Sequence, residues 1–278
     1  MKFTFLMENK TEKPGIVAEH GLSLYIETGE HRILFDAGAS DLFVSNAGKL
    51  GVDLSEVDLA VVSHGHYDHT GGFPAFCRIN SKAPVFMQRN ALRESYGTEN
   101  GEIEEDPCGI LWSDDELKEI SSRIIFTDGP LMLTENIYVT GTIPVGEDFL
   151  PTEKFYVRER RPGGDTYAED DMSHEQCLVV REDDGIFIFS GCSHRGVDNA
   201  IAACRSIFPG EKVRALVAGM HLYSAGPEAR ESVVRRVTEE DIDEVFPVHC
   251  TGIEGICMLK AAMGDRCHAA AAGSTYEF

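Results

Sequence analysis

The stretch LAVVSHGHYDHTGG, residues 59–72, sets three histidines and an aspartate directly after an apolar run. The run predicts a short buried strand, and the loop behind it carries His64, His66, Asp68 and His69. Imidazole and carboxylate ligands together suit zinc, iron or manganese. In extended backbone His64 and His66 point the same way and can share one ion, whereas Asp68 and His69 turn into the next helix and can face a second. The alternative is a polar loop that caps a helix, with Asp68 as its N-terminal cap.

Three further strand-like runs also end in candidate ligands. Cys192 follows IFIFSG, His221 follows VRALVAGM and His249 follows EVFPV. Because open α/β sheets bind ligands at the carboxyl ends of their strands, we expect these ends to meet the histidine loop, residues 64–69, at one site. His194 and His221 can reach this site as proton donors to a leaving group, and His221 is the preferred general acid. Either histidine can instead replace Cys192 as a ligand.

The order of apolar runs and turns is typical of an α/β layer protein. The runs at residues 22–27 and 32–35 flank Thr28 and Gly29 and predict a hairpin. Residues 40–51 predict a helix that begins after Ser40 or Asp41 and ends near Gly51. At the other end of the chain, the tail AAAAGSTYEF, residues 269–278, is expected at the surface.

The middle of the chain, about residues 91–172, differs from the rest in composition. It is polar and acidic, and its apolar runs are too few for a core of its own. We therefore expect one domain over residues 1–278, with this segment inserted at an edge as part of the cover on the substrate side. Within the segment, residues 123–143 predict three short strands in a meander.

The composition argues against several classes of protein. A formal net charge of −22 over 278 residues, with 25 Lys and Arg against 47 Asp and Glu, argues against a nucleic-acid surface. No apolar run approaches the roughly 18 residues of a membrane span, and the N-terminal residues lack a signal-peptide pattern, so we expect a cytoplasmic protein with no membrane partner. The eight cysteines include no C-x-x-C pair and are expected as reduced thiols. The oligomeric state is left open.

The motif SHGHYDHTGG resembles the H-x-H-x-D-H signature of the metallo-β-lactamase superfamily, and ILFDAG resembles the aspartate-bearing turn after its second strand. The resemblance implies an α/β fold, an αββα sandwich, that holds one or two metal ions at one edge. It further implies that Asp36 orients the histidine loop and that Cys192 stands at the bridging position. The implied metal ligands are His64, His66, Asp68, His69, His174, Cys192 and His249.

A narrower likeness covers nearly the whole chain. The segments AEHGLSLYIE, LFDAG, SGCSHRGVDNA, AGMHL and PVHCTG resemble the branch of 7,8-dihydropterin-6-methyl-4-(β-ribofuranosyl)aminobenzene 5′-phosphate synthases. Members of that branch usually carry aspartate where this chain has His174, and GGFHL where this chain reads AGMHL. The departure at His174 leaves open which metal, and how many ions, the site holds.

Four residues are candidates for contact with the substrate. The run VRERRPGG puts Arg158, Arg160 and Arg161 on a flexible loop of an acidic protein. This loop is either a solvated face or an anion-binding lid that places a substrate phosphate near the metals. His20 can line the mouth of the site or face solvent, and Tyr67 and Asn46 are weaker candidates for the pocket wall.

Taken together, these features predict a metal-dependent hydrolase-type enzyme. One or two divalent ions, zinc first and iron or manganese as alternatives, would supply a metal-bound hydroxide that attacks a small, phosphorylated or ester-like substrate. Asp68 can orient this nucleophile, and two ions would make a dinuclear site. One alternative is a dihydropterin-type synthase in which the metal assists departure of pyrophosphate. Another is a non-catalytic metal-binding or redox-sensing protein that uses Cys192 and iron.

Overall fold

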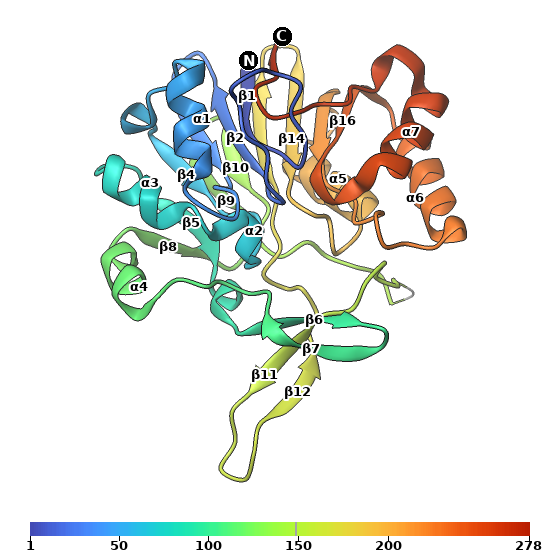
Figure 1. Ribbon diagram of the computed structural model, residues 1–278. Helices are drawn as coiled ribbons and strands as arrows, with labels where there is room; N and C mark the ends of the chain where they lie inside the picture. Colours follow the sequence, from blue (N-terminus) through green and yellow to red (C-terminus); the bar gives the residue numbers. More distant parts are fainter. Residues whose placement is uncertain (148) are drawn as a thin grey trace.

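The computed structural model describes residues 1–147 and 149–278. Two mixed β-sheets lie face to face, and each has helices on its outer side (Figure 1). The predicted αββα sandwich of the α/β class is therefore confirmed. Among the described residues, no helix is long and apolar enough to cross a lipid bilayer.

The first sheet has seven strands and leads into the histidine loop. Its order is β17-β1-β2-β3-β4-β5-β8, with β1 (Lys2–Met7), β2 (Ser23–Glu27), β3 (Arg32–Phe35), β4 (Leu59–Val61), β5 (Val85–Gln88), β8 (Ile124–Thr127) and β17 (Thr275–Glu277). The predicted hairpin is confirmed as the antiparallel pair β2–β3, in which Leu24 lies opposite Phe35. β3, β4, β5 and β8 run parallel, so their carboxyl ends share one edge.

The helices of this half are α1 (Leu42–Leu50), α2 (Tyr67–Thr70), α3 (Phe73–Ile79) and α4 (Asp114–Ser121). The predicted helix at residues 40–51 is α1. It ends at Gly51, whose φ of 74° is a left-handed conformation that favours glycine. Its Phe43 and the α3 residue Phe76 pack against the outer face of the first sheet.

The second sheet has six strands and three helices. Its order is β16-β15-β14-β13-β10-β9, with β9 (Leu131–Thr134), β10 (Ile137–Val139), β13 (Leu178–Glu182), β14 (Gly185–Ser190), β15 (Val213–Ala218) and β16 (Ile242–Pro247). β14, β15 and β16 are parallel. The helices α5 (Val197–Ile207), α6 (Pro227–Glu239) and α7 (Gly252–Met263) cover its outer face.

Alternating side chains join these layers. In β14, Phe187 and Phe189 face the first sheet, whereas Ile186 and Ile188 face the helices. A strand whose two faces are both buried gives such an unbroken apolar run. Phe3 of β1 meets Phe189 edge to face, with ring centroids 5.7 Å apart. Each buried side chain of this size contributes about 1.5–3 kcal/mol, so the layer between the sheets fixes their shared edge.

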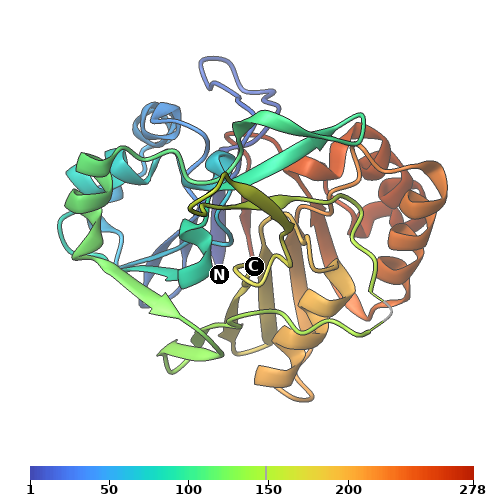
Figure 2. The same ribbon diagram turned by 90° about the horizontal axis from the view of Figure 1, so that it is seen from below.

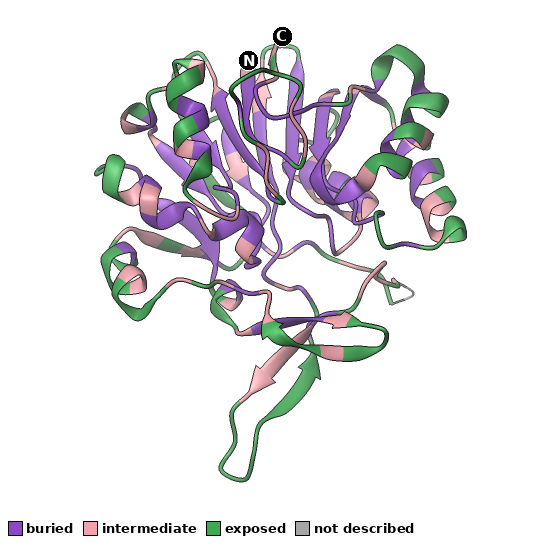
Figure 3. Ribbon diagram, in the orientation of Figure 1, coloured by how far each residue is buried: buried purple, intermediate pink, exposed green. Residues whose placement is uncertain are grey.

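A third sheet covers that edge. Its four strands, in the order β12-β11-β6-β7, are β6 (Ser95–Glu99), β7 (Glu102–Pro107), β11 (Tyr156–Glu159) and β12 (Thr166–Glu169). β6 and β7 lie below the two main sheets in Figure 1 and cross in front of them in Figure 2, which is seen from below. The β11–β12 hairpin projects beyond them and is largely exposed, in contrast to the buried strands above it (Figure 3).

Two expectations about the chain are wrong. Residues 123–143 do not form one meander, because β8 pairs with β5 in the first sheet while β9 and β10 belong to the second. The tail is not a surface segment throughout, since Ala270, Ala271 and Ala272 are buried and β17 pairs with β1. The segment at residues 91–172 contributes β8, β9 and β10 to the two main sheets. Its other strands, β6, β7, β11 and β12, form the third sheet.

Candidate metal centre

The carboxyl ends of four strands bring the predicted site residues to one edge of the sandwich. β4 ends just before the histidine loop, and Cys192, His221 and His249 follow the parallel strands β14, β15 and β16. His221 and His249 have φ values of 46° and 51°, a left-handed conformation that costs free energy in residues other than glycine. Such strain is typical of functional sites, where the surrounding structure holds side chains in place.

The first group of possible ligands is His64, Cys192 and His194, whose ligand atoms all lie within 4.8 Å of one another. His66 joins it, because its Nδ1 lies 3.1 Å from Nε2 of His64. Nε2 of His66 and Nε2 of His194 are buried and have no hydrogen-bond partner among the described residues. A buried polar atom left unpaired costs about 1–3 kcal/mol, and a metal ion would remove this cost.

The second group is His69, Cys192 and His249, again with ligand atoms within 4.8 Å of one another. Nε2 of His69 lies 3.2 Å from Sγ of Cys192, and Nε2 of His249 lies 3.0 Å from Oδ2 of Asp68. Cys192 therefore belongs to both groups and lies between them. Imidazole, thiolate and carboxylate are the ligands that zinc takes in proteins, so this donor set fits one or two zinc ions.

Hydrogen bonds around the cluster leave ligand nitrogens free. Asp36 accepts bonds of 2.7 Å from the main-chain N–H of Ser63, from its hydroxyl, and from Nδ1 of His69. The Ser63 oxygen in turn accepts from Nδ1 of His64 at 2.9 Å. His249 donates from Nδ1 to Oδ1 of Asn9 at 2.7 Å. In each of these rings the hydrogen bond holds a proton on Nδ1, so that Nε2 carries the lone pair whenever the ring is neutral, as metal-binding imidazoles require.

Glycine at position 191 is needed for this packing. A Cβ there would lie 2.2 Å from Oγ of Ser63 and 3.1 Å from Nδ1 of His64. Any larger residue would push Ser63 away from the carboxylate of Asp36. The position implied for Asp36 by the resemblance, that of a residue that orients the loop, matches these contacts.

Replacement of Asp36 by asparagine is expected to destabilise the fold and to weaken metal binding. The amide has one oxygen where the carboxylate accepts three hydrogen bonds, and breaking such a buried network costs about 3–5 kcal/mol. Metal affinity should fall by about 10–100-fold, as for other residues that support ligands. Urea unfolding and competition with a chelator measure the two effects. Asp58→Asn, at a half-exposed turn carboxylate, is the matched control and should change neither.

Burial and charge set the protonation of the cluster. Burial lowers the pKa of His66 to about 3 and lowers the pKa of His194 well below its usual range. These rings are therefore neutral at pH 7, as ligands must be. Burial would also lower the pKa of His69, but the carboxylates of Asp36 and Asp68 outweigh it and raise that pKa to about 9. At pH 7 the His69 ring therefore carries a proton on both nitrogens, and a metal ion has to displace the proton on Nε2 in order to bind there.

The structure does not bring His174 among the ligand atoms, in contrast to the expectation. Its Nδ1 accepts the main-chain N–H of Gly65 at 3.1 Å, and its Nε2 lies 3.3 Å from Oδ2 of Asp170. Both ring nitrogens are therefore used, so His174 holds the loop from behind. His194, which the sequence suggested as a proton donor, takes the place in the cluster that His174 was expected to fill.

His221 lies beside the cluster rather than in its centre. Its Nδ1 is 3.0 Å from Oε2 of Glu153, which also accepts the hydroxyl of Ser224 at 2.9 Å. Burial would lower the pKa of His221, but the neighbouring Cys250 and the carboxylate of Glu153 outweigh it and raise that pKa. A histidine held in this way by a carboxylate is suited to carry a proton.

Sequence reasoning missed several supporting residues. Glu8 and Asn9 follow β1 directly, and they accept the main-chain N–H and the Nδ1–H of His249, each at 2.7 Å. Their position directly after a strand is the sequence feature from which they could have been predicted. Glu153 and Cys250 gave no such signal. Cys250 simply follows His249, and Glu153 lies in a segment without an apolar pattern.

A cavity of about 390 Å³ opens onto the cluster. The histidine loop, Cys192, His221 and His249 contribute to its floor and one wall, and β6 and β7 contribute Glu99 and Glu104 opposite. His20 also lines it, with Nε2 3.1 Å from Oδ2 of Asp68. Tyr67 lies in the wall as predicted. Asn46 does not line it, since its amide is buried and donates to main-chain oxygens of Leu6 and Val17.

The three arginines lie elsewhere. Arg158 is in strand β11 rather than on a loop, and it pairs with Glu94 and Asp165. Arg160 also pairs with Glu94, and Arg161 pairs with Glu159. Among the described residues that line the cavity there is no Arg or Lys. The structure therefore shows no contact through which these side chains would bind a substrate phosphate at the cluster.

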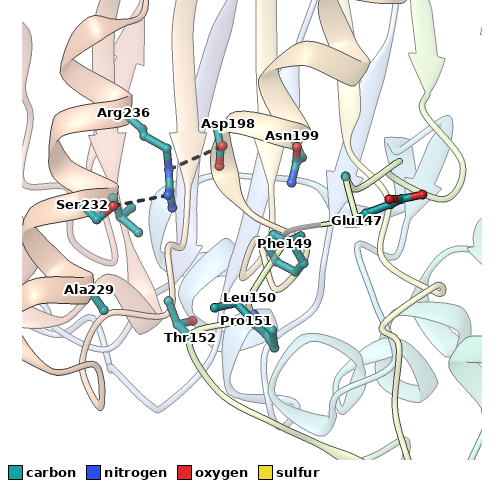
Figure 4. Close-up of a pocket in the computed structure, with 12 residues that line it drawn as sticks. Glu147, Phe149, Leu150, Pro151, Thr152, Asp198, Asn199, Ala229, Ser232 and Arg236 are labelled. Atoms are coloured by element: carbon teal, nitrogen blue, oxygen red, sulfur yellow. Dashed lines mark hydrogen bonds and ion pairs between the residues drawn. The ribbon is translucent and has the colours of Figure 1, made fainter.

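A second cavity, of about 560 Å³, lies between α5, α6 and residues 146–147 and 149–152 (Figure 4). There Arg236 of α6 lies 3.5 Å from the carboxylate of Asp198 and donates to Oγ of Ser232 at 3.4 Å. Its described lining includes no histidine or cysteine. Although this cavity is larger, the possible metal ligands are all at the first one.

Comparisons with known proteins agree with this geometry. Residues 17–130 match the family model of the metallo-beta-lactamase superfamily. The chain is 26% identical to the 7,8-dihydropterin-6-methyl-4-(beta-D-ribofuranosyl)-aminobenzene-5′-phosphate synthase of Methanocaldococcus jannaschii, over 94% of this chain and 90% of the relative.

Two solved structures are also similar. A metal-dependent hydrolase of the beta-lactamase superfamily superposes with a TM-score of 0.82 at 29% identity, over 100% of this chain and 99% of that one. Zinc-bound PqqB from Methylobacterium extorquens has a TM-score of 0.55 at 10% identity, over 100% of both chains, which is a likeness of fold alone.

Proposed function

This chain belongs to the metallo-beta-lactamase superfamily, and we propose that it is a metal-dependent hydrolase of a small, ester-like substrate. The observation that carries the proposal is the pair of buried Nε2 atoms, in His66 and His194, that have no hydrogen-bond partner among the described residues and belong to the first group of possible ligands, beside His64 and Cys192. Of this first group, His66 and Cys192 line a cavity large enough for a small molecule. The similar hydrolase supports the reaction class.

Two metal ions would share the cluster. His64, His66 and His194 would hold one ion, and Asp68, His69 and His249 the other, with Cys192 common to both. Zinc suits this mixture of imidazole, thiolate and carboxylate best, and iron or manganese come next. When bound, such ions lower the pKa of a water molecule to about 7 and polarise the substrate oxygen.

The residues of the chain supply orientation and a proton. Asp68 is held from two sides, by His20 at 3.1 Å and by His249 at 3.0 Å, so its carboxylate can orient the attacking nucleophile. His221 faces the same cavity, with its Nδ1 beside Glu153, and its other nitrogen can deliver the proton to the leaving group. Phe155 and Tyr223 lie beside the His221 ring, with ring centroids 5.8 Å and 5.2 Å from it, and fix its position.

The charge of the cavity favours a neutral substrate. Glu99, Glu104 and Glu153 lie in its wall, and the described lining has no Lys or Arg to oppose them. The metal ions would attract a phosphate group at the cluster itself, but beyond them a phosphorylated substrate would meet these carboxylates with no cationic side chain as a partner. A neutral ester or lactone meets no such repulsion, so we place it before a phosphoester.

The test is hydrolysis of a matched panel by protein loaded with zinc. Neutral esters and lactones are compared with phosphomonoesters and phosphodiesters of the same leaving group. We expect turnover of the neutral class, its loss after chelation, and its return with added zinc. Protein with full metal content that hydrolyses none of the four classes contradicts the proposal.

Replacement of Arg158, Arg160 and Arg161 together by alanine is expected to leave KM for phosphorylated and neutral substrates unchanged within about twofold. Their guanidinium groups are engaged by carboxylates of the hairpin and of Glu94, away from the cavity, and exposed ion pairs of this kind contribute about 0–1 kcal/mol. Steady-state kinetics with both substrate classes measure the effect. A rise in KM confined to phosphorylated substrates would restore these arginines as a phosphate site.

A synthase is the second candidate, because the curated relative from Methanocaldococcus jannaschii carries that name. In this reading the metal assists departure of pyrophosphate from a dihydropterin-type precursor. Release of pyrophosphate that depends on a second, condensing substrate would favour it over hydrolysis. A redox-sensing protein with iron at Cys192 would instead show a visible absorbance band that dithionite bleaches and would turn over neither type of substrate.

A further inference from the structure

Cys250 is a buried nucleophilic group that the proposed hydrolysis does not use. It is 1% exposed, and Cys192 is 2% exposed. The two sulfur atoms and a ring nitrogen of His221 all lie within 4.8 Å of one another. Sγ of Cys250 also accepts the main-chain N–H of His221 at 3.3 Å and lies 3.8 Å from the main-chain oxygen of Cys192. The chain therefore places two thiols side by side at the edge of the metal cluster.

The strand between the two cysteines leaves the space between their sulfurs open. Cys192 follows β14 and Cys250 follows β16, with the end of β15 between them. The residue directly after that end is Gly219, where a Cβ would lie 2.7 Å from Sγ of Cys250 and 3.2 Å from Cα of Cys192. A side chain at this position would separate the two residues. Glycine lets them face each other across the strand.

Small molecules can reach both sulfurs. Cys192 and Cys250 line the cavity that opens onto the cluster, together with His221 and Tyr223. Cys177 and Cys204 are a second pair of buried free thiols, and both belong to one hydrophobic cluster. That pair is fully buried in the core between the second sheet and its helices and does not line the cavity. The protein thus contains a matched pair that differs mainly in access.

We propose that Cys192 and Cys250 are a modification site at which a peroxide forms a disulfide, and that this bond displaces the metal from the cluster. In the first step a peroxide oxygen is transferred to the sulfur of Cys250, which gives a sulfenic acid and one water molecule. The sulfur of Cys192 then attacks that sulfur, the S–O bond breaks, and a second water molecule leaves. Two thiols are oxidised by two electrons in all, and one hydrogen peroxide is reduced to two water molecules.

Loss of Cys192 would affect both metal ions at once. Cys192 belongs to both groups of possible ligands. The first group contains His64 and His194, and the second contains His69 and His249. A thiolate is a metal ligand, whereas a disulfide sulfur carries no charge and binds zinc poorly. Formation of this one disulfide bond would therefore remove a ligand from both metal positions of the proposed centre. This consequence rests on the proposed function, but formation of the bond does not.

The experiment treats zinc-loaded protein with hydrogen peroxide at one to a few equivalents. Digestion without reduction, followed by mass spectrometry, detects a peptide pair joined through Cys192 and Cys250, and a chromogenic chelator follows zinc release. We expect the joined pair to form, zinc to be released with the same time course, and both changes to reverse with dithiothreitol and added zinc. Cys177 and Cys204 should stay reduced in the folded protein under the same dose.

Two variants complete the design. Cys250→Ala should retain zinc at a peroxide dose that empties the parent protein, whereas Cys204→Ala should release zinc as the parent does. Should Cys250→Ala fail to fold or to load zinc, the joined peptide in the parent protein still decides the matter. Absence of that peptide, or equal joining of Cys177 to Cys204, overturns the proposal. The joined peptide without zinc release would keep the modification site and contradict the proposed metal centre instead.

Discussion

Protein in which both His64 and His66 are replaced by alanine is expected to lose metal and to turn over its substrate about 1,000-fold more slowly or worse. The two rings are neighbours, with Nδ1 of His66 3.1 Å from Nε2 of His64, and Nε2 of His66 is buried without a hydrogen-bond partner among the described residues. With both gone, the first group keeps only Cys192 and His194. A bound ion supplies several kcal/mol of transition-state stabilisation, and each 1.36 kcal/mol is a factor of ten in rate.

The measurements are metal per chain by elemental analysis and kcat on the neutral esters or lactones proposed above. His31→Ala is the control, because His31 lies in the β2–β3 turn and takes part there through its main chain. It should keep both metal and turnover. Circular dichroism separates loss of ligands from loss of fold. An unchanged metal content in the double variant would show that the ligand assignment is mistaken.

Much of the fold could be predicted because its signals are local. The apolar run of β14 and the hairpin β2–β3 depend on side chains and turn residues that are neighbours in sequence. The rule that ligands gather at carboxyl ends of strands then brought the histidine loop, Cys192, His221 and His249 to one place before any contact was known. Parallel pairing of β14, β15 and β16 is the physical reason that the rule holds here.

The parts that failed depend on partners far away in sequence. Nothing in residues 123–143 indicates that β8 should pair with β5 while β9 and β10 join the other sheet. All three are short runs with turn residues between them, which is also what a meander looks like. The tail was misjudged for a similar reason. Alanine is weakly apolar, and Ala270 is buried only because it packs in the core with residues far away in sequence, such as Phe3.

The choice between His174 and His194 as a metal ligand could not be made from the sequence, for the same reason. Both are single histidines near a strand, in SHEQ and in SGCSHRG, and the family pattern favoured the first. The structure separates them by hydrogen bonds to Gly65 and Asp170, residues that no spacing connects to His174. Ligand identity here is a property of which ring nitrogen remains free, and a sequence does not carry that information directly.

Substitution of alanine for His194 is therefore expected to weaken metal binding by more than 100-fold, and substitution for His174 by no more than 10–100-fold. His194 offers a buried Nε2 without a partner among the described residues and shares its group with His64 and Cys192. His174 is engaged at both nitrogens and acts only through the loop, as other supporting residues do. Chelator competition gives the two affinities, and kcat should follow the metal content.

His174→Ala should instead show its effect in stability. It leaves the N–H of Gly65 and the carboxylate of Asp170 without their partner, which costs about 1–3 kcal/mol of unfolding free energy. His174→Gln, which keeps a donor and an acceptor, should recover part of this loss, whereas His194→Gln should recover little metal affinity. If His174→Ala loses a full equivalent of metal while His194→Ala keeps it, the family pattern is right and the free nitrogen of His194 has another purpose.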